Sequence, residues 1–270
     1  MEPTINIALR AARKAGELII RAQEQLDRLV VENKSINDFV SEVDRSAEQE
    51  ILFHLKKAFP RHGYRCEESG YTPGTGDGAD YEWVIDPLDG TTNYLRGIPH
   101  FAVSIACKYK GKLEHAVVLD PVRGEEFTAS RGKGAALNGR RIRVSAQKSL
   151  EGALLGTGIP FRTSHMARLD AYTDTLNAFA RANTAGIRRA GSASLDLAYV
   201  AAGRFDAFWE IELNEWDWAA GALLVTEAGG LISDMDGGNN YAARGDLVCG
   251  TPKVFKAVLQ IVKPKLGTQA

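Results

Sequence analysis

The sequence has few of the features that mark several large classes of protein. Its three cysteines, Cys66, Cys107 and Cys249, are odd in number and far apart. They suggest neither a disulfide framework nor a zinc module, and we expect free thiols. No stretch approaches the ~20 consecutive apolar residues of a membrane-spanning helix. Residues 1–4 place no basic patch before an apolar run, as a signal peptide would. These absences predict a cytoplasmic protein with no membrane partner.

Strong net charge and nucleophile motifs are also absent. The 33 Lys and Arg against 34 Asp and Glu give a formal net charge of −1, so no overall field would draw the chain to nucleic acid. The five histidines show no metal-ligand spacing. Neither a Gly-x-Ser-x-Gly elbow nor a Gly-x-x-x-x-Gly-Lys phosphate loop occurs, which argues against a Ser, Cys or His nucleophile. With 44% hydrophobic residues in a chain of 270, the protein can nevertheless bury a sizeable core.

The first half of the chain predicts two helices followed by antiparallel strands. Thr4 is the expected cap of a helix through Ile19, and a second helix covers 43–59 before Pro60 ends it. Polar residues 32–38 and the Gly- and Thr-rich residues 70–80 predict loops. Apolar, β-branched segments separated by turn residues predict strands at 101–109, 113–119 and 126–130.

The second half alternates between short strands and helices. Strands are expected at 153–156, 186–188, 206–209 and 248–250, and helices at 167–182, 194–202, 217–228 and 253–263. Nothing marks a clean boundary, so we expect one domain over residues 1–270, with about 1–150 and 151–270 as possible subdomains. Packed layers of sheet and helix are the natural arrangement.

The stretch from Trp83 to Asn93 carries the clearest chemical signal. An apolar run ends there in Asp86 and Asp89, with a proline and a glycine that turn the backbone. Two carboxylates three positions apart can converge on a cation, and the carbonyl of Leu88 between them can add an oxygen ligand. Hard oxygen ligands favour Mg²⁺ or Mn²⁺ over Zn²⁺. An ordinary Asp-Gly turn is the alternative.

Two neighbouring pairs of residues extend this hypothesis. If Thr91 and Thr92 begin a short helix, their N–H groups could face a phosphate, although they could also only cap the turn. Glu67 and Glu68 lie shortly upstream. They could belong to a solvated loop, but beside a metal site one of them is a plausible further ligand.

Asp217 is flanked by two tryptophans at the expected start of a helix. A partly buried aspartate there must be paired, act as a cap or bind a metal. The helix N-cap is the alternative, and capping does not exclude metal binding.

Taken together, these residues resemble the inositol monophosphatase family over essentially the whole chain. The strings from Trp83 to Asn93 and from Trp216 to Gly230 carry the resemblance. Residues 8–16, 37–40 and 191–203 resemble its bacterial SuhB type. The resemblance implies an α+β fold, a layered α-β-α-β-α sandwich of the sugar-phosphatase type, and a Mg²⁺-dependent phosphomonoesterase that is often dimeric and inhibited by Li⁺.

The family pattern assigns roles to residues at matching positions. It implies one metal on Glu67, Asp86 and the Leu88 carbonyl, a second on Asp86, Asp89 and Asp217, and a third, weaker one near Glu67, with Mn²⁺ able to replace Mg²⁺. The pattern also implies that Thr91 and Asp44 orient the attacking water and that Gly90 and Thr91 bind the phosphate. Substrate hydroxyls would contact Asp89, Ala193 and Glu210. Lys34 would be a basic residue on an accessory loop.

The resemblance therefore predicts hydrolysis of inositol 1-phosphate by an activated water. Related alternatives are a fructose-1,6-bisphosphatase and a 3′-phosphonucleotide phosphatase. A second role, also implied only by resemblance, is regulation of ribosomal RNA antitermination through partners such as NusA, RNA polymerase or rRNA. Basic segments at 131–133, 140–143 and 188–189 could serve such partners, although ordinary solvated turns are the simpler interpretation.

Overall fold

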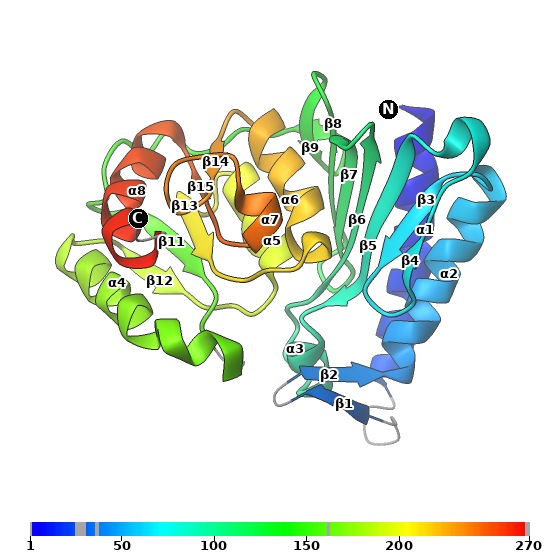
Figure 1. The fold of residues 1–270 in the computed structure, drawn as a ribbon, viewed down its shortest axis with the longest axis horizontal. Coiled ribbons are helices and arrows are strands. Elements are labelled where there is room, and N and C mark those ends of the chain that lie inside the picture. Colours follow the sequence, from blue (N-terminus) through cyan, green and yellow to red (C-terminus); the bar gives the residue numbers. More distant parts are fainter. Residues whose placement is uncertain (1, 25–30, 36–37, 161–162, 268–270) are drawn as a thin grey trace.

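The chain folds into five layers, in which helices alternate with two β-sheets (Figure 1). The computed structural model describes residues 2–24, 31–35, 38–160 and 163–267. Three clusters of buried apolar residues lie between successive layers. The expected α-β-α-β-α sandwich is confirmed.

The larger sheet has eight strands and is mainly antiparallel, with β3 parallel to β5. Its order is β10 (Arg140–Arg141), β9 (Gly134–Leu137), β8 (Glu125–Ser130), β7 (Lys112–Asp120), β6 (Ala102–Tyr109), β5 (Tyr81–Asp89), β3 (Gly63–Cys66) and β4 (Gly70–Thr72).

Two helices, α1 (Pro3–Gln23) and α2 (Glu42–Ala58), cover the outer face of this sheet (Figure 1). Their apolar residues recur every three or four positions, so each helix buries one stripe and leaves the rest in water. Ile19 on α1 and Ile51 and Leu55 on α2 are fully buried there.

The middle layer consists of α5 (Ala193–Ala201) and α6 (Glu215–Glu227), which lie between the two sheets (Figure 1). Both helices are apolar on nearly every side because each has neighbours on more than one face. The beginning of each helix carries acidic residues, and these beginnings lie near the end of β5.

The smaller sheet has the order β12 (Gly186–Arg188), β11 (Leu154–Thr157), β13 (Ala207–Glu210), β15 (Leu247–Gly250) and β14 (Leu231–Ser233). Its outer face is covered by α4 (Leu169–Arg181) and α8 (Pro252–Leu266) (Figure 1). Short helices α3 (Thr91–Leu95) and α7 (Tyr241–Arg244) and the 3₁₀ helices η2 (Gly76–Gly78) and η3 (Thr163–Arg168) complete the fold.

Most of the expected helices and strands are present within a few residues of the predicted bounds. The loop expected at 32–38 is wrong in part. The structure has a hairpin of β1 (Val31–Ser35) and β2 (Asp38–Ser41), because backbone pairing with β2 outweighs the polar composition of β1. The loop at 70–80 likewise contains β4 and η2, and the first helix begins at Pro3, before Thr4.

The three cysteines are free, as expected, and the structure shows that all three are buried. Across the described ranges, no helix is both long and apolar enough to cross a membrane.

Candidate active site

A bulge in β5 places the two aspartates of the Asp-Gly motif on the same cavity. Asp86 lies opposite Ser104 of β6, whereas Asp89 lies opposite Ala102, so β5 has one residue more than its partner strand. In a regular strand, residues three apart point to opposite faces. The extra residue at Pro87-Leu88 cancels this alternation, and both carboxylates line a cavity of ≈ 150 Å³.

Gly90 makes the turn from β5 into α3. Its φ of 96° lies in the left-handed region, and a Cβ there would come within 3.1 Å of the His100 carbonyl oxygen and 3.2 Å of that of Gly191. Backbone from three segments meets at this point. Glycine is therefore required both by the turn and by the space.

The Thr91 hydroxyl joins the turn to α2. It lies 3.1 Å from Oδ1 of Asp44 and 3.0 Å from the carbonyl oxygen of Leu88, and can donate to either. Asp44 is in the first turn of α2 and is buried. The predicted pairing of Thr91 with Asp44 is thus present, across 47 residues of sequence.

Glu67 follows β3 and is held beside β5. Its N–H donates to the Ile85 carbonyl at 3.1 Å. The next two N–H groups, of Glu68 and Ser69, donate to the buried carboxylate of Glu48 at 2.8 and 2.9 Å. Glu48 therefore fixes the loop that brings Glu67, rather than Glu68, to the cavity.

Asp217 reaches the same cavity from α6. It is the third residue of the helix, and its Oδ2 accepts the N–H of the N-cap residue Asn214 at 2.7 Å. Asn214 occupies the N-cap position considered for Asp217. Because only one oxygen of Asp217 accepts this hydrogen bond, capping leaves the other for a ligand.

An ion-pair network fixes the start of α6 against the larger sheet. Lys108 on β6 lies 2.5 Å from Glu82 and 2.7 Å from Glu215, and Arg65 on β3 lies 3.2 and 3.1 Å from the same two carboxylates. Lys108 is largely buried. The network sets the position of α6, and hence of Asp217, relative to β5.

Burial and mutual repulsion both disfavour ionisation of the carboxylates, and burial contributes more. Burial raises the pKa of Asp86 well above its usual range, and the negative charges of Glu67 and Asp89 raise it further. Burial likewise raises the pKa of Asp217 well above its ordinary value, followed by the charges of Asp89 and Glu67. Ionising this cluster is therefore costly unless positive charge enters it.

Asp89 is tied to the start of α5. Its Oδ2 accepts the hydroxyl of Ser192 and the N–H of Ser194, each at 2.7 Å. Burial raises its pKa, and the hydrogen bonds from Ser194 and Ser192 oppose that rise. These two serines were not predicted, because nothing in their local sequence marks them as partners of a residue about 100 positions away.

The chemistry of this donor set fits a hard divalent cation. It offers carboxylates and a backbone carbonyl, without thiolate or imidazole, and its members raise one another's pKa as acidic groups around a cation site do. Over the ranges that the structure describes, no three Asp, Glu, His or Cys side chains already form an arrangement that could hold a metal ion. Binding would require the carboxylates to exchange part of their hydrogen bonding for the cation.

The other predicted residues divide into two groups. Ala193 and Glu210 line the same cavity as the carboxylates, although both lie in the second half of the sequence. Lys34 lies in β1, and its side chain is outside the described part of the chain. The structure adds Gly158, Arg189 and Asp196 to the lining.

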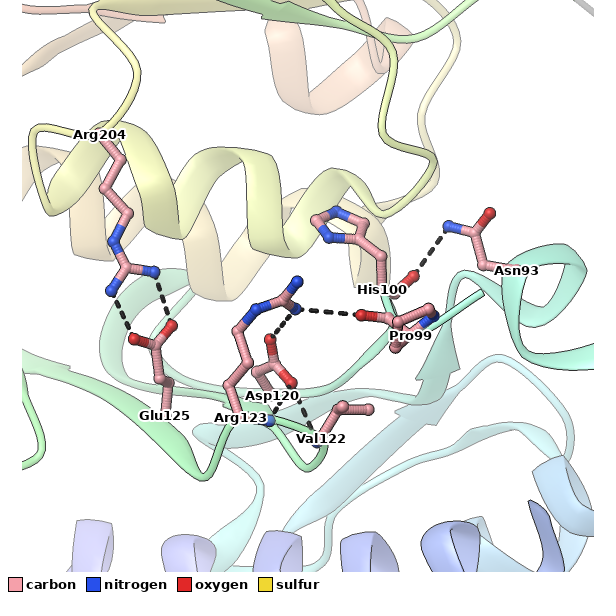
Figure 2. Close-up of polar contacts among 8 residues, drawn as sticks. All are labelled: Asn93, Pro99, His100, Asp120, Val122, Arg123, Glu125 and Arg204. Carbon is pink, nitrogen blue, oxygen red and sulfur yellow. Dashed lines mark hydrogen bonds and ion pairs between the residues drawn. The ribbon is translucent and has the colours of Figure 1, made fainter. Parts of the chain in front are cut away.

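Asn93 locks the turn after the motif against the other half of the molecule. Its side-chain amide donates to the carbonyls of His100 and Ala190, each at 2.8 Å. Figure 2 shows the amide of Asn93 pointing at the His100 carbonyl. The turn that carries Gly90 is therefore fixed from both sides.

Arg123 supports the same turn from below in Figure 2. Its guanidinium donates to the carbonyl of Pro99 at 3.1 Å and to Oδ2 of Asp120 at 2.8 Å. Asp120 is fully buried, and its other oxygen accepts the N–H groups of Val122 and Arg123. The β7–β8 turn is thus a rigid support for residues 96–100.

Comparison with known proteins agrees with this fold. A model of the inositol monophosphatase family matches residues 1–264, and the chain belongs to that family. It is 64% identical to the Nus factor SuhB of Pseudomonas aeruginosa, over 98% of either chain. The crystal structure of the extragenic suppressor protein suhB from Bartonella henselae superposes with a TM-score of 0.92 at 42% identity, covering 97% of this chain and 99% of that one. An inositol monophosphatase from Anabaena gives a TM-score of 0.83 at 32% identity, over 96% and 95% of the two chains.

Proposed function

We propose that the protein is a Mg²⁺-dependent phosphomonoesterase that hydrolyses inositol 1-phosphate to inositol and phosphate. The observation that supports this most strongly is the meeting of four carboxylates on one cavity, from three separate parts of the fold: Glu67, Asp86, Asp89 and Asp217. Membership of the inositol monophosphatase family supports the reaction class.

The proposed metal ligands follow the family pattern. Glu67, Asp86 and the Leu88 carbonyl would hold one ion, and Asp86, Asp89 and Asp217 a second. Glu67 would also border a weaker third ion. When bound, the ions supply positive charge that lowers the pKa of the attacking water, neutralises the phosphate and stabilises the leaving oxygen.

The protein groups orient the reactants. The Thr91 hydroxyl, which can donate to Asp44, can at the same time accept a hydrogen bond from the attacking water. Asp44 holds the hydroxyl oriented or accepts its proton. The backbone of Gly90 and Thr91 would bind the phosphate. In this proposal, water attacks the phosphorus directly and in line, without a phosphoenzyme.

Three of the residues that line the cavity would hold the alcohol part of the substrate, and we call them the alcohol-binding wall. They are Glu210, Asp89 and the backbone of Ala193, which suit hydroxyl groups. Gly158 makes room for Glu210, because a Cβ on Gly158 would come within 1.7 Å of Oε1 of Glu210. This acidic wall favours a polyol over a second phosphate group, which would be repelled.

Phosphate release across a substrate panel tests the proposal. Inositol 1-phosphate, fructose 1,6-bisphosphate and 3′-phosphoadenosine phosphate are each incubated with and without Mg²⁺, with Mn²⁺ as a substitute and Li⁺ as an inhibitor. We expect Mg²⁺-dependent turnover that is fastest with inositol 1-phosphate. Faster turnover of one of the other two would assign the substrate to that class, and turnover without a divalent cation would contradict the metal scheme.

We also propose a second role, in transcription antitermination. The observation that favours it is the 64% identity to a protein named Nus factor SuhB. Partners would be transcription proteins such as NusA and RNA polymerase, or rRNA. The protein would meet them in the cytoplasm and would act there as a homodimer.

A pull-down with Asp86→Asn separates the two roles. If the variant retains NusA or RNA polymerase without turnover, the roles are independent. If neither form retains these partners or rRNA, the second role is wrong. Light scattering after size-exclusion chromatography, at several protein concentrations, measures the expected dimer.

A further inference from the structure

Asp196 is a buried acid that has no role in the proposed reaction. It lies on α5, is only 1% exposed, and lines the same cavity as the carboxylate cluster. Within the described ranges, its Oδ1 is buried and has no hydrogen-bond partner. Leaving a buried polar atom unpaired destabilises a fold, so such an atom requires an explanation, and binding a ligand is one.

The surroundings of Asp196 indicate what that ligand is. It interacts electrostatically with Glu210 and Asp89, both on the proposed alcohol-binding wall, and with the guanidinium of Arg189. All four residues line the cavity. Burial raises the pKa of Asp196 well above its usual range, and Glu210 and Asp89 raise it further.

The same wall contains Gly158, whose missing side chain leaves space that the Glu210 carboxylate fills. Asp196 on α5 and Glu210 on β13 both line this cavity. Two acidic side chains suit neighbouring hydroxyl groups on a carbon ring better than an anion or an apolar group, because each carboxyl oxygen can accept one hydroxyl proton.

We infer that Asp196 is a specificity residue whose free oxygen accepts a hydrogen bond from a hydroxyl of the substrate's polyhydroxy alcohol, next to the hydroxyl bound by Glu210. The inference rests on the proposed phosphatase function and deepens it. It predicts that Asp196 discriminates substrates by their alcohol part and contributes little to bond cleavage at phosphorus.

The test compares two substrates and two variants of the full chain. Inositol 1-phosphate has ring hydroxyls, whereas 4-nitrophenyl phosphate has none. With Asp196→Ala, we expect KM for inositol 1-phosphate to rise about 3- to 10-fold, the range for a lost hydrogen bond to a neutral group. We expect kcat to stay near the wild-type value, and 4-nitrophenyl phosphate hydrolysis to change less than about twofold. Asp196→Asn retains an acceptor oxygen and should recover part of the affinity.

The melting temperature distinguishes a binding role of Asp196 from a structural one, because loss of a structural residue would lower it. Because Oδ1 of Asp196 is unpaired, Asp196→Asn should leave the melting temperature unchanged or raise it. The matched control is Asp246→Asn, a buried aspartate that accepts Arg168 at 2.8 Å and the N–H of Glu212 at 3.0 Å. This substitution weakens satisfied hydrogen bonds and should lower the melting temperature.

Three results overturn the inference. One is an equal loss on both substrates accompanied by a lower melting temperature, which would make Asp196 structural. Another is no change in KM for inositol 1-phosphate in Asp196→Ala. If wild-type protein hydrolyses neither substrate in Mg²⁺, the proposed function itself fails. That failure is distinguishable because it is seen before any variant is made.

Discussion

Replacing Asp86 by asparagine should make the metal-free protein more stable while it abolishes turnover. Asp86 is 2% exposed, and its pKa is raised first by burial and then by the charges of Glu67 and Asp89. Asparagine is nearly isosteric and can still accept the Leu88 N–H that Oδ1 now accepts at 2.9 Å. The substitution therefore removes one buried negative charge with little change in packing.

Two melting experiments measure the effect. Without divalent cations, relief of the repulsion should raise the melting temperature by roughly 2–4 °C, corresponding to about 1 kcal/mol in a chain of this size. With Mg²⁺ at about 100 times its dissociation constant, the wild type should gain about 2.7 kcal/mol, or roughly 5–10 °C. Asp86→Asn should lose most of that second gain, because the ligand is missing.

The pH dependence follows from the direction of the pKa shift. The folded pKa of Asp86 lies above its unfolded value, which is about 3.9. Its favourable contribution to metal-free stability is therefore complete below about pH 4 and is lost as pH rises through the folded pKa. The difference between Asp86→Asn and the wild type should be small near pH 4 and grow toward neutral pH.

Asp174→Asn is the matched control, because Asp174 is exposed on α4 and away from the cavity. It makes the same chemical change and should leave both melting temperatures unaltered. The reasoning is refuted if Asp86→Asn lowers the metal-free melting temperature at neutral pH, or if its response to Mg²⁺ equals that of the wild type.

Three further predictions concern single side chains. Thr91→Val removes the hydroxyl that can bond to Asp44 and should lower kcat by about 100-fold with little change in KM. Thr91→Ser should retain most activity. Equal kcat values for the wild type and both variants would contradict the positioning role. Gly158→Ala places a Cβ within 1.7 Å of the Glu210 carboxylate. KM for inositol 1-phosphate should therefore rise at least about tenfold, while 4-nitrophenyl phosphate hydrolysis is unchanged. An unaltered KM would show that the alcohol-binding wall does not bind the alcohol. Lys108→Met leaves Arg65 as the remaining cation of the network beside Glu82 and Glu215 and should cost about 1–3 kcal/mol in urea denaturation. A midpoint equal to that of the wild type would show that Lys108 adds no stability.

Local sequence was sufficient for the parts of the fold that depend on periodicity. The apolar spacing of α1 and α2 and the turn-separated strands β6 to β8 each carry their own signal, and the structure agrees with it. The hairpin of β1 and β2 carries no such signal, because a polar strand is stabilised by its partner rather than by its own residues. The strands β9, β10 and β14 were also missed, because segments this short carry too little periodicity to be predicted.

For the site, the sequence by itself determined which side chains are chemically able to act. Asp86, Asp89, Gly90 and Thr91 lie in one short segment, so their sequence alone marks them as a possible site. Asp217 is marked by the tryptophan on either side of it. Only the tertiary structure decided which groups meet. The bulge in β5 turns both aspartates toward one cavity, Ser192 and Ser194 reach Asp89 across about 100 residues, and Asp196 is left buried with an unpaired oxygen. Contacts between layers depend on how strands and helices pack in three dimensions, and a linear pattern records only neighbours along the chain.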